Sequence, residues 1–152
     1  MPSAVSQISL DKLPPYNLEA EQSVLGACFK AEDAISKALE VLSEGDFYKA
    51  AHQKIFRAMR GRFEVSEPID VLGLADCLQQ ANELDFSGGV DYLSHLEDFV
   101  PTATAVVHHA KIIREKKILR DLIHTATEIV TNSYSESDTA EEILDHAEKS
   151  IF

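Results

Sequence analysis

The most constraining feature of this sequence is a long segment without a helix breaker, from Ala105 to about Asn132, which contains neither glycine nor proline. Apolar residues recur in it at intervals of three, four and seven, which is the spacing of one face of an α-helix. At ~1.5 Å per residue, a helix of this length is a rod of about 42 Å. The sequence therefore predicts one long helix over this segment.

A shorter helix is predicted to fold back along this rod. The segment "SYSES" indicates a turn, and Asp138 and Glu141 stand three residues apart, as in a capping box that opens a helix. Residues 105–132 carry five basic and three acidic side chains, a net charge of +2, whereas residues 133–152 carry one basic and six acidic, a net charge of −5. Because these charges favour antiparallel pairing, we expect a helical hairpin. The apolar stripe of its shorter helix consists of Ala140, Leu144, Ala147 and Ile151.

The long helix has more apolar surface than this partner helix can cover. Its first stripe contains Ile112, Leu119, Leu122, Ala126 and Ile129. Its second stripe, about 100° around the helix, contains Val106, Ile113, Ile123 and Val130. The last helix is about 21 Å long and covers half of the rod, so the remaining apolar surface is expected to meet the globule, a second copy or another protein. We predict that two chains pair through it, with the dimerisation residues Ile112, Leu119, Leu122 and Ala126.

The segment before the hairpin predicts a small group of five helices. Turn residues separate apolar runs with helical spacing, and no run of useful length indicates a β-strand. Gly26 interrupts the first helix and indicates a close contact with a neighbour. The predicted fold is all-α, a small helical globule followed by an extended helical hairpin. Its parts are a disordered lead-in at 1–13, the globule at 14–104 and the hairpin at 105–152. The five helices are expected at 18–29, at 31–42, from about 49, after the cap residue Asp70, and at 90–99.

Composition and charge limit the possible compartments and partners. Apolar residues make up 45% and charged residues 26% of the chain, as in ordinary soluble globular proteins. No apolar run approaches the ~20 residues that span a membrane, and the N-terminus lacks the pattern of a signal peptide. Cys28 and Cys77 are isolated, so the cytoplasm is the expected compartment. The net charge of −12 argues against a direct grip on nucleic acid.

Patterns typical of catalysis are missing from the sequence. A phosphate-binding P-loop requires a glycine before a lysine, and none of the six glycines precedes one. His108 and His109 are neighbours and point about 100° apart on a helix, so they do not chelate a metal together. We expect His52 to be a hydrogen-bonded, partly buried histidine, and Cys28 and Cys77 to be small buried hydrophobes. The residues thus indicate an all-helical interaction module without catalytic, cofactor-binding or metal-binding residues.

Seven phrases of the sequence together resemble the N-terminal domain of bacterial replicative DNA helicases of the DnaB family. The resemblance covers nearly the whole chain, from Leu13 to Phe152. The phrases are "LPPYNLEAEQSVLGA" (13–27), "DFYKAAHQKIFRAM" (46–59), "PID" (68–70), "GGVDYL" (88–93), "VPTA" (100–103), "IIREKKILRDLI" (112–123) and "ILDHAEKSIF" (143–152).

This resemblance implies a hexameric ring that encircles one DNA strand, with an ATPase motor in a C-terminal domain beyond Phe152. ATP and magnesium would bind that domain and not this chain. In the family, hairpins pair into dimers, and three dimers form a collar above the motor. The collar docks the C-terminal domain of primase, a helicase loader is a further partner, and DNA binds only to the full helicase. Tyr92, Ile123 and Ile129 match family positions linked to primase binding.

Two other classes of protein remain open from the residues themselves. A free-standing helical adaptor would have the same fold and no motor in its natural chain, and a longer parent with a P-loop would exclude it. A helical enzyme would have a pocket lined by titratable groups with perturbed pKa values. The sequence beyond Phe152 would discriminate best between a helicase and an adaptor.

Overall fold

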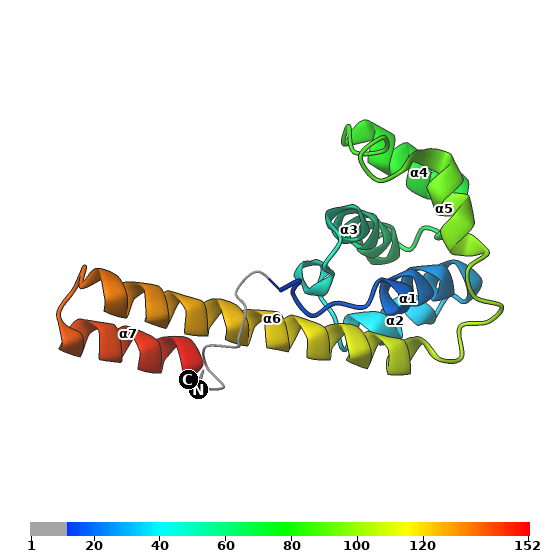
Figure 1. Cartoon of the computed structure of the whole chain (residues 1–152). Coiled ribbons are helices and arrows are strands. Elements are labelled where there is room, and N and C mark those ends of the chain that lie inside the picture. The colour runs from blue at the N-terminus through cyan, green and yellow to red at the C-terminus, as the bar shows by residue number, and fades with distance from the viewer. Residues whose placement is uncertain (1–11) are drawn as a thin grey trace.

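A computed structural model describes residues 12–152, so the lead-in expected at 1–13 lies almost entirely outside the described residues. The described chain is helical and contains no β-strand, which confirms the predicted all-α fold. It builds a globule first and then a hairpin that projects from it (Figure 1). The helices are α1 (Leu18–Lys30), α2 (Ala34–Leu39), α3 (Ala50–Glu64), α4 (Val71–Gln80), α5 (Gly89–Glu97), α6 (Val106–Ser135) and α7 (Ala140–Ile151), with a 3₁₀-helix, η2 (Glu44–Asp46), before α3.

An apolar core holds the globule together, and α1 lies at its centre. α1 packs against α2, α3, α5 and α6, and nearly all of its middle residues are buried. Asn17 begins this helix by accepting a hydrogen bond from the backbone N–H of Ala20 at 2.9 Å, as an N-cap residue does. Phe47, Phe56 and Met59 are among the largest fully buried side chains around it. The five helices expected in this region are all present.

Gly26 lies where α1 meets the end of α5. A Cβ atom at this position would stand 2.6 Å from the backbone carbonyl oxygen of Leu96 and 3.2 Å from the side chain of Val100. A backbone oxygen cannot move aside as the end of a flexible side chain can, so a residue without Cβ is needed for this approach. The close packing that the sequence indicates at Gly26 is confirmed.

We expect Gly26→Ala to destabilise the globule, although alanine favours a helix. The higher helix propensity contributes about 1 kcal/mol, whereas overpacking a core typically costs about 1–3 kcal/mol. Thermal unfolding should therefore show a lower Tm. Gly61→Ala in α3 is the matched control and should raise Tm, because an added Cβ at Gly61 meets no atom within 4 Å. A Gly26→Ala protein more stable than the wild type would contradict the close packing.

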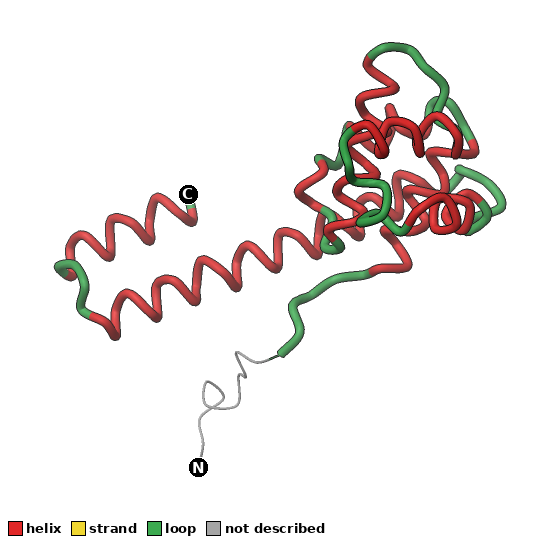
Figure 2. Tube along the Cα trace, turned by 90° about the horizontal axis from the view of Figure 1, so that it is seen from above, coloured by secondary structure: helices red, strands yellow, loops and turns green. Residues whose placement is uncertain are grey.

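α6 belongs to both parts of the molecule. Its first turns pack on α1 and α2, where Val106, Ala110 and Ile113 are buried. Beyond Ile113 none of its residues is buried, and this part projects from the globule with α7 antiparallel beside it (Figures 1 and 2). The structure thus contains the predicted extended hairpin. None of the helices formed by residues 12–152 is both long and apolar enough to cross a membrane.

Two helix lengths differ from the prediction. α2 is shorter than expected, because Ala31 is extended after α1 and the next helix begins only at Ala34. α6 is longer than expected and includes the first three residues of "SYSES". It ends at Glu136, whose φ of 50° is in the left-handed region and turns the chain. The predicted turn is therefore shifted toward the C-terminus.

The cap of α7 also differs from the prediction. The hydroxyl of Thr139 accepts a hydrogen bond from the backbone N–H of Glu142 at 3.2 Å. The predicted capping box of Asp138 and Glu141 is therefore wrong by one residue. Adjacent aspartate and threonine are both good N-cap residues, so the sequence pattern did not separate them.

Candidate functional site

The projecting part of α6 presents a row of exposed apolar side chains, which we call the hairpin face. Each of its residues is between 39% and 53% exposed. At about 100° per residue, they lie within an arc of about 140° on one side of the helix. Exposed apolar side chains gathered on one side of a helix make this part of α6 a candidate for contact with another protein. The hairpin face consists of Ile118, Leu119, Leu122, Ile123 and Val130.

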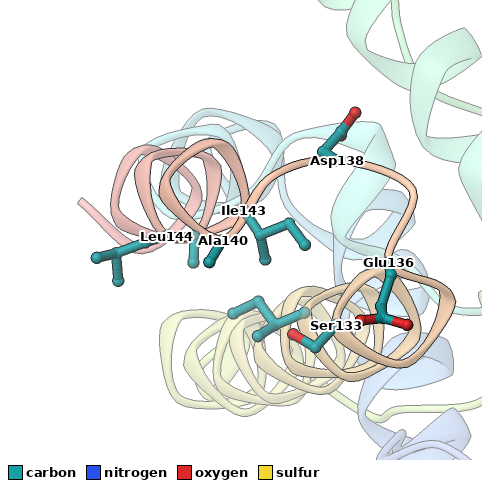
Figure 3. Close-up of a pocket in the computed structure, with 8 residues that line it drawn as sticks. Ser133, Glu136, Asp138, Ala140, Ile143 and Leu144 are labelled. Atoms are coloured by element: carbon teal, nitrogen blue, oxygen red, sulfur yellow. The ribbon is translucent and has the colours of Figure 1, made fainter.

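α7 covers the end of α6 and leaves a hollow between the two helices. The cavity has a volume of about 390 Å³. Figure 3 shows Ile143 pointing from α7 toward α6, whereas Leu144 lies at the outer edge and is largely exposed. Since α7 has 12 residues and α6 has 30, much of the rod has no cover from α7. The cavity is lined by Ile129, Ser133, Glu136, Asp138, Ala140, Ile143, Leu144 and Ala147.

The four residues predicted to form a dimer contact lie in two environments. Leu119 and Leu122 belong to the hairpin face, and Ala126 is exposed on the same part of α6. Ile112 instead packs against the globular core, because it lies in the first turns of α6. The apolar surface that is open to another chain therefore begins at Ile118.

Two arginines of α6 fasten the hairpin to the globule. Arg114 donates to the carboxylate of Asp46 at 2.7 Å, and the Asp46 side chain is almost fully buried. Arg120 donates to the backbone oxygens of Pro15 at 2.9 Å and of Asp46 at 2.8 Å. Its guanidinium also lies 5.4 Å from the ring centre of Tyr48, within the range of a cation–π interaction. These contacts fix where the projecting part of α6 begins.

Tyr92, the first residue predicted to bind primase, lies on α5 and is half-buried. Its hydroxyl is 2.6 Å from Nε2 of His52 and 3.4 Å from Nε2 of Gln22. The rings of Tyr92 and His52 are nearly parallel, with an interplanar angle of 6° and ring centroids 5.9 Å apart. Nζ of Lys49 lies 4.7 Å from the centre of the Tyr92 ring. Tyr92 is therefore tied to the interior of the globule and partly open to solvent.

Behind Tyr92, His52 and Glu21 form a buried polar pair. Nδ1 of His52 is 2.8 Å from Oε1 of Glu21, and their side chains are 1% and 2% exposed. The Glu21 carboxylate also accepts hydrogen bonds from the backbone N–H groups of Tyr48 at 2.7 Å and Lys49 at 3.3 Å. A carboxylate only accepts, so a neutral His52 has its proton on Nδ1 and accepts from Tyr92 through Nε2. The predicted hydrogen bonding of His52 is confirmed, and its burial is complete.

The other two residues predicted to bind primase lie on the hairpin. Ile123 belongs to the hairpin face, whereas Ile129 is half-buried and lines the cavity beneath α7. Figure 1 shows α5 at one end of the molecule and the tip of the hairpin at the other. One chain therefore offers two separate surfaces, one around Tyr92 on the globule and one on the hairpin.

The shifted pKa values belong to groups in separate parts of the globule. Burial raises the pKa of the Cys28 thiol to about 12, which fits the predicted small buried hydrophobe. Cys77 is only half-buried, so its burial was overestimated. A hydrogen bond from Lys54, together with the neighbouring Arg57, lowers the pKa of Glu83. Among residues 12–152, no three metal-binding side chains form a cluster.

Sequence reasoning missed the polar residues that join the helices. Glu21 did carry a signal, because it lies on the same helical face as Leu25 and Cys28, four and seven residues further on. A carboxylate on an apolar face needs a buried partner. Asp46 carried no such signal, since an aspartate in a turn before a helix is ordinary.

Comparisons with known proteins agree with this geometry. The family model described as "DnaB-like helicase N terminal domain" matches residues 13–115. The crystal structure of the N-terminal domain of DnaB helicase from Mycobacterium tuberculosis has a TM-score of 0.88 and 38% sequence identity, over 91% of this chain and 98% of that chain. The chain belongs to the DnaB family of helicase N-terminal domains. The resemblance drawn from the seven sequence phrases is thereby confirmed.

Relatives in the DnaB family include longer proteins. The replicative DNA helicase DnaB of Geobacillus stearothermophilus is 44% identical over 147 residues, which are 97% of this chain and 32% of that protein. The replicative DNA helicase DnaC of Bacillus subtilis is 45% identical over 141 residues, which are 93% of this chain and 31% of that protein. This chain thus spans about a third of the length of each of these two relatives.

Proposed function

We propose that this domain is the collar of a hexameric replicative DNA helicase, where it assembles the ring through protein contacts and docks primase. A helicase loader would bind elsewhere on the ring. The motor, with its ATP and magnesium, and the contact with DNA would belong to the rest of the protein. The observation that carries this proposal is the exposed hairpin face on a domain of the DnaB family.

The hairpin face supports pairing between two chains. A buried leucine contributes ~1.5–3 kcal/mol, whereas association itself costs an estimated ~4–15 kcal/mol. Each residue of the hairpin face is only about half exposed, so pairing gains about half of the leucine value at each of five positions on each chain, or roughly 8–15 kcal/mol. This gain is of the same order as the cost, so the dimer should be of modest affinity. A two-fold axis would place the same face of both chains in the contact. Three such dimers would form the collar.

Primase docking is supported by the two separate surfaces. Tyr92 keeps part of its ring open on the globule, and Ile123 is exposed on the hairpin of the same chain. A single primase domain that contacts the Tyr92 surface of one chain and the hairpin of another would bridge two chains. Docking would then depend on assembly of the collar.

Titration with a primase C-terminal domain tests the docking. Fluorescence anisotropy should show saturable binding to the wild type and about tenfold weaker binding to Tyr92→Ala, the effect of truncating an aromatic hot-spot residue that contributes about 1.4 kcal/mol. Leu72→Ala is the matched control and should bind as the wild type does, since Leu72 is 81% exposed on α4. If the wild-type chain does not bind the primase domain at the highest concentration tested, the proposed docking of primase is wrong.

We also expect that the isolated domain does not bind single-stranded DNA. Of the five basic residues at 105–132, Arg114 and Arg120 already bind the globule and Lys117 pairs with Asp121 at 2.9 Å. The net charge of −12 repels phosphate. Anisotropy of a labelled strand at low salt, where attraction between charges is strongest, should show no binding. Clear binding of the labelled strand that is abolished by added salt would mean that the collar binds DNA directly.

A further inference from the structure

The buried pair of Glu21 and His52 is hydrogen-bonded to Tyr92, and Tyr92 is partly exposed at the surface. We propose that His52 is a positioning residue, with its tautomer set by Glu21, and that it holds Tyr92 in the orientation that docks the partner. This inference rests on the proposed function, since it requires Tyr92 to contact the primase domain.

The contacts around Tyr92 restrict both its hydroxyl and its ring. The hydroxyl lies 2.6 Å from Nε2 of His52 on α3, to which it donates when neutral His52 has its proton on Nδ1, and the two rings are nearly parallel. His95 stacks on the Tyr92 ring at 6.0 Å with an interplanar angle of 21°, and Lys49 lies over the ring. A surface tyrosine without such contacts would have to be ordered on binding, and that ordering reduces affinity. Tyr92 is ordered in advance.

His52 is itself fixed by groups that do not reach the surface. Its Nδ1 donates to Glu21 from α1, and the same carboxylate accepts two backbone N–H groups at the start of α3. This arrangement directs the lone pair of Nε2 toward the Tyr92 hydroxyl. A polar chain thus runs from α1 through α3 to α5 and determines where the Tyr92 hydroxyl lies.

Two substitutions at position 52 separate positioning from packing. In His52→Asn the amide takes the place of Nδ1 and still donates to Glu21, but nothing replaces Nε2. In His52→Gln the longer side chain places an oxygen near Nε2, where it accepts from Tyr92. We expect His52→Asn to weaken binding of a primase C-terminal domain about two- to tenfold, as for the loss of one hydrogen bond. His52→Gln should restore most of this affinity, and circular dichroism should show both variants folded at the assay temperature.

Tyr92→Phe tests the same link without disturbing the buried pair. It removes only the hydroxyl, so we expect the same loss of affinity as in His52→Asn. The double variant should bind no more weakly than either single variant, because both changes break one shared hydrogen bond. Additive losses would show that the two side chains act independently, and they would overturn the inference. If His52→Asn does not fold, wild-type affinity of Tyr92→Phe overturns it.

Tyr92→Ala distinguishes failure of this inference from failure of the proposed function. If Tyr92→Ala weakens binding and His52→Asn does not, Tyr92 docks the partner without help from His52, and only the inference is wrong. If Tyr92→Ala binds as tightly as the wild type, the docking role of Tyr92 is wrong and the inference falls with it. Equal losses of primase affinity in His52→Asn and His52→Gln would mean that His52 has a purely structural role, and they would also overturn the inference.

Discussion

Replacement of Leu122 by aspartate is expected to leave the chain monomeric at concentrations at which wild-type chains associate. Leu122 is 53% exposed in the middle of the hairpin face and does not line the cavity beneath α7. Pairing would bury this position on both chains, and a carboxylate without a partner resists burial. Loss of two leucine contacts of ~1.5 kcal/mol each already weakens association about 100-fold. Light scattering over a concentration series measures the effect.

Leu72→Asp is the matched control for this change. Leu72 is even more exposed, at 81%, but it lies on α4 of the globule. The same chemical change should therefore leave association unaltered there. Both variants should keep the helical circular dichroism of the wild type. If Leu122→Asp associates as strongly as Leu72→Asp, the hairpin face is not the contact between chains.

The largest loss of stability is expected from Glu21→Ala. This change removes the acceptor for the fully buried Nδ1–H of His52 and for the partly buried N–H groups of Tyr48 and Lys49. A fully buried donor without a partner costs about 1–3 kcal/mol, so we expect a total loss of about 2–4 kcal/mol. For a domain of this size, that loss corresponds to a fall in Tm of about 5–15 °C. Thermal unfolding followed by circular dichroism provides the measurement.

Glu19→Ala is the matched control for the buried carboxylate. Glu19 occupies the same first turn of α1 but is exposed, so its loss should cost only the ~0.3–1 kcal/mol of a helix-dipole interaction. Glu21→Gln should fall between the two, because its amide keeps one oxygen acceptor and turns an N–H₂ group toward a backbone donor. Equal unfolding midpoints for Glu21→Ala and Glu19→Ala would show that the buried network contributes little.

Helices with long apolar patterns could be predicted from the sequence, as could the start of α4 after its cap residue Asp70, but the ends of the hairpin helices could not. α6 carries an uninterrupted period, so its existence followed from the spacing alone. The end of α6 depends on which residue adopts the left-handed backbone conformation. Glutamate has no conformational preference that identifies Glu136 as this residue. Asp138 and Thr139 offered equally good caps for α7, and the structure uses Thr139. The spacing of apolar residues determines where a helix lies. The choice among neighbouring cap and turn residues determines the residue at which it begins or ends.

An uncovered apolar surface on α6 could be predicted because apolar residues outnumber what the length of α7 covers, although Ile118 belonged to neither predicted stripe. The polar contacts could not, since they join residues distant in sequence. His52 lies 40 residues from Tyr92, and Arg114 lies 68 residues from Asp46. Spacing carries no signal for such pairs, which form only once the helices have packed. The contact of Ile112 with the globular core carried no signal for the same reason, and its predicted role in the dimer stays a prediction.

Sedimentation equilibrium of the wild-type chain tests most directly the central claim that chains meet through their hairpins. The mass should rise with concentration from the monomer value of 16.8 kDa toward twice that value. Leu122→Asp, measured in parallel, should keep the monomer mass throughout. A wild-type mass that stays at the monomer value at the highest concentration tested would contradict the assembly role of the hairpin face.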